Sequence, residues 1–380
     1  MSRWQALAAI ATIFAGRAAS ADVLRANEPP PAADSPPAAV VPADRIDAPA
    51  PRAKAPPSKL RRLAAIGAAI VPGLVIRGAG SYVLGERRTA RRLLATGAAG
   101  LSAAIVGALP VALTRANENF VWPGVPLAVA GFGVYLPTWF ADIWVAAGGD
   151  RVEGGPRGTP PWSLELGTTW LHDAYRERAL AGAAARLELG RLGLGAGTLL
   201  DAQGDSRTGQ LEVRWRLFGA PAANRPIDEG SRLYMRAGGR LHRDDPDDVT
   251  LATVELEVVL RGELRHLDPL LAGTFLELST GLGVERAAYA RDTHDVSSIL
   301  LGRFAWGAYL GRRGEAMLFY DHRREHLAGG LWTWRASGFV GSFGATAQLA
   351  VAGPWAVRAE LEVGSAWVST LALRYHGGQR

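Results

Sequence analysis

The chain has 380 residues, which is enough for two or three domains, and it contains no cysteine. The lack of cysteine excludes disulfide frameworks, thiolate metal sites, cysteine nucleophiles and a lipoprotein anchor. The formal net charge of +6 is carried almost entirely by arginine. Because these arginines alternate with acidic residues instead of forming a block, nucleic acid is a poor candidate partner.

The first 21 residues have the three parts of a secretory signal peptide. Arg3 supplies a positive start, an uncharged apolar stretch runs from Trp4 to Phe14, and Ala19-Ser20-Ala21 fits a small-residue cleavage site. The alternative is a short membrane anchor, but the apolar stretch is short for a span and Arg17 interrupts it. We therefore predict an exported protein with a cleaved signal peptide at residues 1–21.

Residues 22–60 have the composition of a disordered linker. Ten prolines lie between Pro29 and Pro57, separated mainly by alanine. Such a segment buries too little apolar surface to fold and favours extended polyproline conformations. We expect it to act as a semi-rigid spacer.

Residues 61–149 form a hydrophobic region with helical character. The stretches 93–114 and 119–141 contain no charged residue, and their length alone predicts two transmembrane helices. Their alanine, glycine and proline content makes membrane insertion marginal. The alternative is a helical hairpin that packs against an apolar surface.

One short motif within this region resembles a known class of domain. Val71-Pro72-Gly73, followed by Gly78-Ala79-Gly80-Ser81-Tyr82-Val83-Leu84-Gly85, resembles the turn of small bacterial two-helix membrane domains. Basic residues follow that turn, as they do here from Arg87 to Arg92. The resemblance covers about 25 residues between 71 and 92, and it implies membrane association without a specific chemistry.

From Trp162 onward the apolar period changes to two, which is the signature of β-strands. Glycine-, proline- and aspartate-rich turns separate the alternating runs, and no helix-period run intervenes. At roughly 18 residues per strand and connection, residues 162–380 predict an antiparallel barrel of about 12 strands, with an even number from 10 to 14.

Apolar and polar residues alternate along the strands of both a membrane barrel and a soluble sandwich. In the membrane barrel the apolar face points outward to lipid, whereas in the sandwich it is buried in the core. We favour the barrel because both signs of charge are interleaved on the polar face of each strand. The charged set expected in the lumen is Glu212, Arg214, Glu255, Glu257, Glu360 and Glu362. The apolar set expected toward lipid or a core is Val213, Trp215, Leu256, Val258, Leu361 and Val363.

Aromatic residues near the expected strand ends indicate an interfacial girdle, which a sandwich would instead bury in its core. They are Trp162, Trp170, Trp215, Phe218, Trp306, Tyr309, Trp332, Trp334, Trp355 and Trp367. The last strand resembles the closing strand of bacterial outer-membrane proteins, with Leu371, Leu373 and Tyr375 on one face. It departs from that pattern because four residues follow Tyr375 before Arg380.

One motif matches a zinc site in spacing but not in context. His322, Glu325 and His326 form H-x-x-E-H, which binds zinc when it lies on a helix. Here a strand-like run, 317–320, precedes it and a glycine turn follows. We therefore expect a charged strand end and no metal or cofactor.

Other polar clusters also have a structural explanation that we favour. The acidic run 244–248 predicts a solvated hairpin loop rather than a calcium site. Gly193, Gly195 and Gly197 alternate within a strand, so they do not form a phosphate loop. An acyl-transfer or hydrolytic site built from His172, His242 or His294 with a loop serine is the remaining catalytic alternative.

We expect a non-enzymatic outer-membrane β-barrel that serves as a small pore, a binding scaffold or an envelope component. It would contact membrane lipid and, during biogenesis, the barrel-assembly machinery. One alternative is an inner-membrane anchor with a periplasmic β-domain that binds lipid or a partner. Another is a barrel hydrolase or acyltransferase. For the protein to reach the outer membrane, the helical hairpin must be too weakly apolar to be retained in the inner membrane during export.

Overall fold

The computed structural model describes residues 57–149, 155–172, 177–223, 227–245, 248–289, 293–322 and 341–378. The signal peptide and nearly all of the linker lie outside these residues and stay predictions. Everything described below belongs to one compact unit, Pro57–Arg380.

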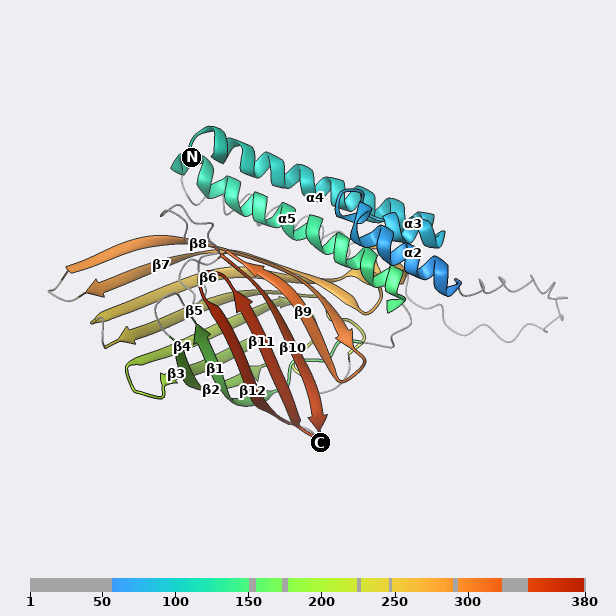
Figure 1. Cartoon of the computed structure of the whole chain (residues 1–380). Helices are drawn as coiled ribbons and strands as arrows, with labels where there is room; N and C mark the ends of the chain where they lie inside the picture. Colours follow the sequence, from blue (N-terminus) through green and yellow to red (C-terminus); the bar gives the residue numbers. More distant parts are fainter. Residues whose placement is uncertain are drawn as a thin grey trace, which may run out of the picture. The chain divides into compact units, whose positions relative to one another are not determined.

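Twelve antiparallel strands close into a barrel (Figure 1). Each strand pairs with its neighbours in sequence, and β1 pairs with β12 from Trp162↔Gly377 to His172↔Trp367. The predicted fold class and the strand number of about 12 are therefore confirmed. The strands are β1 (Trp162–His172), β2 (Glu177–Leu189), β3 (Leu192–Asp201), β4 (Ser206–Phe218), β5 (Arg232–Asp244), β6 (Val249–Glu263), β7 (Thr274–Tyr289), β8 (Thr293–Leu310), β9 (Gly314–Asp321), β10 (Ser342–Ala352), β11 (Trp355–Val363) and β12 (Trp367–Gly377).

The barrel has two ends, which we name by the strands that begin there. The terminal end contains Trp162 and Gly377, so the first strand begins and the last strand finishes at this end. The distal end contains His172 and Trp367. The β4–β5 connection, residues 219–231, and the β6–β7 connection, residues 264–273, both lie at the terminal end.

Side-chain facing follows the predicted alternation. On β6, Val254, Leu256 and Val258 are exposed at 67%, 51% and 38%, whereas the neighbouring Glu257 is only 1% exposed. On β11, Leu361 is 43% exposed and Glu362 is 2% exposed. An apolar outer surface around a charged interior is the reverse of a soluble protein and is the pattern of a membrane barrel. The predicted facing is confirmed for these strands.

The aromatic prediction holds in part. Trp162, Tyr375 and Trp355 stack at the terminal end, with ring centroids 5.3 Å and 5.0 Å apart, and Trp170 and Trp367 are exposed at the distal end. Tyr309 is a correction, because it is 3% exposed and lies beside Phe275 instead of in a girdle. Its odd position on β8 directs it inward, together with Leu301 and Ala305. Trp332 and Trp334 lie outside the described residues.

The helical region consists of α2 (Lys59–Ile70), η1 (Pro72–Leu74), α3 (Ala79–Leu84), α4 (Arg87–Leu113) and α5 (Glu118–Ala147). The last two cover the uncharged stretches 93–114 and 119–141 and form an antiparallel hairpin (Figure 1). Asn117 caps α5 by accepting from the Asn119 backbone N–H at 3.0 Å. Two short 3₁₀ turns, η3 (Leu264–His266) and η4 (Pro269–Leu271), lie in the β6–β7 connection.

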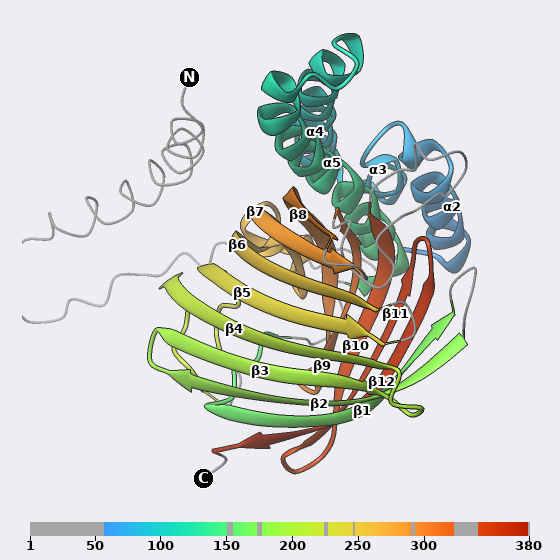
Figure 2. The same ribbon diagram turned by 90° about the vertical axis from the view of Figure 1, so that its left-hand side faces the viewer.

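The hairpin packs on the outer wall of the barrel, beside β7 and β8 (Figure 2). A Cβ added at Gly133 of α5 would lie 2.6 Å from both Leu278 of β7 and Phe304 of β8. Near the terminal end, Phe140 of α5 contacts Trp306 of β8, with ring centroids 5.7 Å apart. The packing of α5 at Gly133 explains why Phe304, an outward-facing residue, is only 6% exposed. Trp306 therefore contacts the hairpin rather than forming part of an open girdle.

Candidate functional site: the charged lumen and its terminal end

Inward-facing arginines and acids pair along the barrel wall. Glu165 of β1 pairs with Arg358 of β11 at 3.0 Å and with Arg374 of β12. Arg374 also donates from Nη1 to the Oε1 of Gln348 on β10 at 2.6 Å. Charge-assisted contacts of this kind hold the long side chains against the wall.

A second group of ion pairs crosses the glycine-rich strand β3. Glu188 of β2 accepts from Arg214 at 2.7 Å and from Arg216 at 3.0 Å, both on β4. Gly193 of β3 lies between these strands, and a Cβ there would be 2.9 Å from the Glu188 carboxylate. This glycine leaves room for the carboxylate, which supports the structural explanation of the G-x-G-x-G sequence.

Further ion pairs line the wall between β4 and β9. Arg236 of β5 pairs with the buried Glu257 of β6, and it lies 3.7 Å from Glu212 of β4. Arg261 of β6 pairs with Glu277 of β7 at 3.0 Å and with Glu315 of β9 at 2.8 Å. Among the described residues these pairs join strands one to three positions apart. They therefore line the wall and do not bridge the lumen from side to side.

Three inward-facing arginines form no ion pair within the described part of the chain. Arg186 of β2 lies in register between Ser163 and Gly195, neither of which is acidic. The guanidinium of Arg303 lies 4.4 Å from the ring centroid of Phe319, and that of Arg232 lies 6.0 Å from the ring centroid of Tyr234. Carboxylates nevertheless act on all three electrostatically: Glu212 acts on Arg186, and Glu277 acts on Arg232 and Arg303. The lumen around them therefore presents both signs of charge.

Two segments meet at the terminal end of the barrel. They are residues 155–161, which come directly before β1, and the connection 219–231 between β4 and β5, of which the structure describes 219–223 and 227–231. The Ala223 N–H donates to the Thr159 carbonyl at 2.8 Å, and the Ile227 N–H donates to the Pro156 carbonyl at 3.1 Å. A Cβ at Gly158 would lie 2.3 Å from the Ala223 oxygen, so this close approach requires glycine.

The same connection is bonded to the wall. The Gly230 N–H donates to Oε1 of Glu263 at 2.5 Å, and the Tyr309 hydroxyl donates to the same oxygen at 3.3 Å. The space left between these segments and Arg232, Arg261 and Glu315 measures only about 20 Å³, which is about the volume of one water probe. The two segments therefore fill this part of the terminal end.

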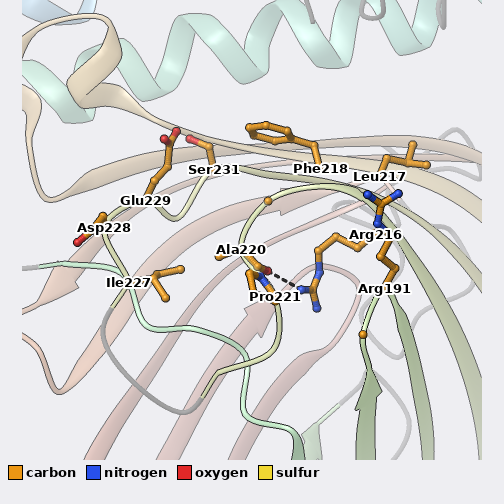
Figure 3. Close-up of a pocket in the computed structure, with 12 residues that line it drawn as sticks. Arg191, Arg216, Leu217, Phe218, Ala220, Pro221, Ile227, Asp228, Glu229 and Ser231 are labelled. Atoms are coloured by element: carbon orange, nitrogen blue, oxygen red, sulfur yellow. Dashed lines mark hydrogen bonds between the residues drawn. The ribbon is translucent and has the colours of Figure 1, made fainter. Parts of the chain in front are cut away.

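A larger cavity of about 920 Å³ lies beside this contact (Figure 3). Its lining includes Arg191 and Arg216 from the strand ends, and Asp228 and Glu229 from the 219–231 connection. Arg216 donates to the Ala220 carbonyl and so fixes the start of the connection. The cavity therefore presents both signs of charge.

One carboxyl at this end has a displaced pKa. Burial acts to raise the pKa of Glu229, but hydrogen bonds from Ser231 and His266 outweigh it and hold that pKa below its usual value. The His266 Nε2 lies 2.7 Å from Oε1 of Glu229. Glu229 is therefore ionised at neutral pH and joins the 219–231 connection to η3.

The H-x-x-E-H candidates are only partly described. His322 follows β9, and its Nδ1 lies 2.7 Å from the Tyr320 hydroxyl. Glu325 and His326 lie outside the described residues, so their contribution to a zinc site stays untested. Among the residues that the structure describes, no group of three His, Asp or Glu side chains is placed to hold a metal ion.

Two residues of the acidic run and two of the other histidines have arginine, acid or hydroxyl partners, while residues 246 and 247 of the run lie outside the described residues. Asp244 pairs with Arg178 at 3.0 Å, and Asp245 pairs with Arg243 at 2.5 Å. His172 pairs with Glu177 at 2.9 Å. The other two described histidines of the catalytic alternative lie on β5 and β8: the ring of His242 bonds the Thr208 hydroxyl, and His294 is exposed. The described contacts do not bring these histidines together with a serine.

Sequence reasoning missed the Arg261–Glu277–Glu315 cluster and the filled terminal end. Arg261 and Glu277 each sit within an alternating run, but their pairing depends on which strands become neighbours. The contact between 155–161 and 219–231 joins two irregular segments, for which periodicity carries no signal. The glycine at 158 was the available hint, since close backbone approach often requires glycine.

No protein-family model matches the chain, and no curated protein matches it. The chain is similar in fold to bacterial outer-membrane barrels of known structure. A KdgM porin in complex with disordered oligogalacturonate is 6% identical, with 57% of this chain and 99% of that chain covered and a TM-score of 0.38. Omp33 of Acinetobacter baumannii is 8% identical, with 58% of this chain and 100% of that chain covered and a TM-score of 0.31.

The β domain of the Bordetella autotransporter BrkA is 16% identical, covering 58% of this chain and 99% of that chain, with a TM-score of 0.33. These superpositions are loose, so the assignment of class rests on barrel closure and side-chain facing. The described chain is a closed antiparallel β-barrel with an apolar outer wall, and it resembles bacterial outer-membrane β-barrels in general rather than one family.

Proposed function

We propose that this protein is an outer-membrane pore for small polar solutes, with its terminal end closed at rest. The observation that carries the proposal is the charged lumen lining. Ion pairs run along the wall, and Arg186, Arg232 and Arg303 also face the lumen without a close ion pair among the described residues. Twelve strands are also intermediate between narrow eight-strand barrels filled by side chains and wide porins.

The resting closure is inferred from the terminal end. The segment 155–161 and the connection 219–231 are hydrogen-bonded to each other and, through Glu263, to the wall. Passage of a solute would require these contacts to open or the 920 Å³ cavity to provide a side route. Closure at this end predicts a low resting conductance.

The test is a planar-bilayer recording with full-length protein and with a variant in which a short glycine-rich turn joins Phe218 to Arg232. We expect the shortened variant to conduct more than the full-length protein. In that background, Arg186→Gln combined with Arg303→Gln should shift the ion selectivity toward cations in a salt gradient, because each change removes a positive charge from the lumen. The control is Arg207→Gln, because Arg207 faces outward and is 56% exposed.

The proposal fails if the shortened variant does not conduct, or if its selectivity is the same with and without Arg186 and Arg303. The outcome with Arg207→Gln separates a lumen effect from a change in total charge. Both charge variants must first show heat-modifiable migration in detergent gels, so that a loss of conductance is not a loss of fold.

Location in the outer membrane, with assembly by the barrel-assembly machinery, is part of the same proposal. The apolar outer wall argues against a soluble periplasmic β-domain on an inner-membrane anchor, because such a domain would expose that wall to water. Membrane fractionation tests this, since an inner-membrane position would favour the anchor. A hydrolase or acyltransferase has less support, because the described histidines are dispersed.

A further inference from the structure

We propose that the α4–α5 hairpin is inserted in the same bilayer as the barrel, with a basic collar at the terminal end that binds anionic phospholipid headgroups. The inference requires the barrel to lie in a bilayer, but it is independent of what passes through the lumen. Its first support is continuity of apolar surface. One side of the hairpin covers the outer wall of β7 and β8. The opposite side of the hairpin is itself apolar and exposed, as the covered wall would otherwise be.

The exposed side of the hairpin is strongly apolar. On α4, Ile105, Val106, Leu109 and Leu113 are exposed at 53%, 63%, 52% and 75%, comparable with Leu166 at 68% on the open barrel wall. Patches of this size on a water-exposed hairpin would be costly to hydrate. Because the outer wall of the barrel already faces lipid, the same bilayer would cover both that wall and the exposed side of the hairpin.

The hairpin also has the length and placement of a spanning element. Both helices are long and apolar enough to cross a membrane, with 27 and 30 residues, which correspond to about 40 and 45 Å at about 1.5 Å per residue. The base is fixed at the terminal end, where Arg92 donates to the Leu267 carbonyl at 2.6 Å and Leu93 packs on Leu271. From there α5 follows β8 past Gly302, which Val129 approaches.

Packing inside the hairpin is typical of helices in lipid. A Cβ at Gly131 of α5 would lie 2.3 Å from the Ala104 backbone nitrogen and 2.7 Å from the Gly100 carbonyl oxygen of α4. Gly107 and Gly124 approach one another in the same way. Small residues that bring two backbones together are the usual interface in membranes, where burial of large side chains gives little advantage.

The basic collar consists of Lys59, Arg61, Arg87, Arg88 and Arg91, all of which are exposed. These residues belong to α2 and the start of α4, and α2 packs on the end of α5 through Ala65, Ala69 and Ala146. Exposed apolar side chains of the same region, including Leu63, Val71 and Val75, are 66%, 73% and 75% exposed. Apolar residues beside clustered arginines are characteristic of segments that lie at an anionic lipid interface.

The natural lack of cysteine allows a direct test of depth. Single-cysteine variants Ile105→Cys, Leu166→Cys and Gln203→Cys of the full chain would carry an environment-sensitive fluorophore in vesicles of phosphatidylcholine with phosphatidylglycerol. Leu166 is the lipid-facing reference on β1, and Gln203 is the water-exposed reference in the β3–β4 turn. We expect nitroxide-labelled lipids to quench the Ile105 and Leu166 probes but not the Gln203 probe.

The outcomes separate this inference from the proposed pore. Quenching at Leu166 without quenching at Ile105 overturns the inserted hairpin and leaves the barrel in its bilayer. Absence of quenching at Leu166 contradicts the membrane barrel itself. Every variant is first checked for heat-modifiable migration, which reports an intact barrel.

The collar is tested by native mass spectrometry of full-length protein with equimolar phosphatidylglycerol and phosphatidylcholine. We expect retained phosphatidylglycerol to exceed phosphatidylcholine. The triple change Arg87→Gln, Arg88→Gln and Arg91→Gln should reduce that preference by roughly fivefold per arginine. The matched control is Arg207→Gln with Arg243→Gln, which removes charge near the distal end. An unchanged preference in the triple variant, or an equal loss in the control, overturns headgroup binding by the collar.

Discussion

At the scale of single residues, the most informative feature is a carboxylate that is more buried than its apolar neighbours. Glu257 is 1% exposed and Leu256, the next residue, is 51% exposed. Burial of a carboxylate is unfavourable unless a cation and hydrogen bonds compensate. Arg236 provides that compensation, so Glu257 is stable only in a lumen with arginine on a neighbouring strand.

We expect Glu257→Ala to destabilise the barrel by about 1–3 kcal/mol, because it removes the close ion pair between the buried carboxylate and Arg236. Glu177→Ala is the matched control. Glu177 is 60% exposed and, in the described part of the chain, pairs with the exposed His172, so its loss should cost less than about 1 kcal/mol. The temperature at which each variant loses its folded gel migration measures the difference, and equal temperatures would contradict the role assigned to Glu257.

Residue patterns predicted the facing of the strands but not every side chain. Alternation placed Glu255, Leu256 and Glu257 correctly because each strand has one polar and one apolar face. Tyr309 was assigned to the girdle from its nearness to a strand end, whereas its position in the alternation directs it inward. For aromatic residues, the parity within the strand was therefore the better guide.

At the scale of elements, the helical hairpin depends on close contact between backbones. The uncharged stretches predicted the two helices, but nothing in them indicated β7 and β8 as the packing surface. Phe304 and Trp306 look like ordinary lipid-facing residues in the sequence, and α5 covers them only in the folded chain. Contacts between elements so far apart in sequence leave no periodic signal.

We expect Gly131→Ala to weaken the hairpin by about 1–3 kcal/mol, since its methyl group would meet backbone atoms of α4 that cannot move away. Gly67→Ala is the control in α2. No atom lies within 4 Å of a Cβ at Gly67, so this change should instead stabilise its helix by roughly 1 kcal/mol. Thermal loss of helical circular dichroism distinguishes the two, and a Gly131→Ala protein as stable as the parent would show that α4 and α5 are not in close contact.

At the scale of the whole described unit, a charged lumen, an apolar wall and an attached apolar hairpin form one consistent membrane protein. The number of strands and the barrel closure followed from counting alternating runs between turn signals. The filling of the terminal end did not, because it joins the irregular segments 155–161 and 219–231. The parts specified by local periodicity were predictable, and the parts specified by pairing between distant segments were not.

The most direct test of the account is a comparison of two adjacent residues on β6. Leu256→Cys and Glu255→Cys, each the single cysteine of its chain, would be labelled with the same fluorophore in lipid vesicles. The account predicts that nitroxide lipids quench the probe at 256, while only a small water-soluble quencher reaches the probe at 255. Equal quenching of both probes by lipid, or of both by the water-soluble quencher, would contradict a barrel with an apolar wall and a charged lumen.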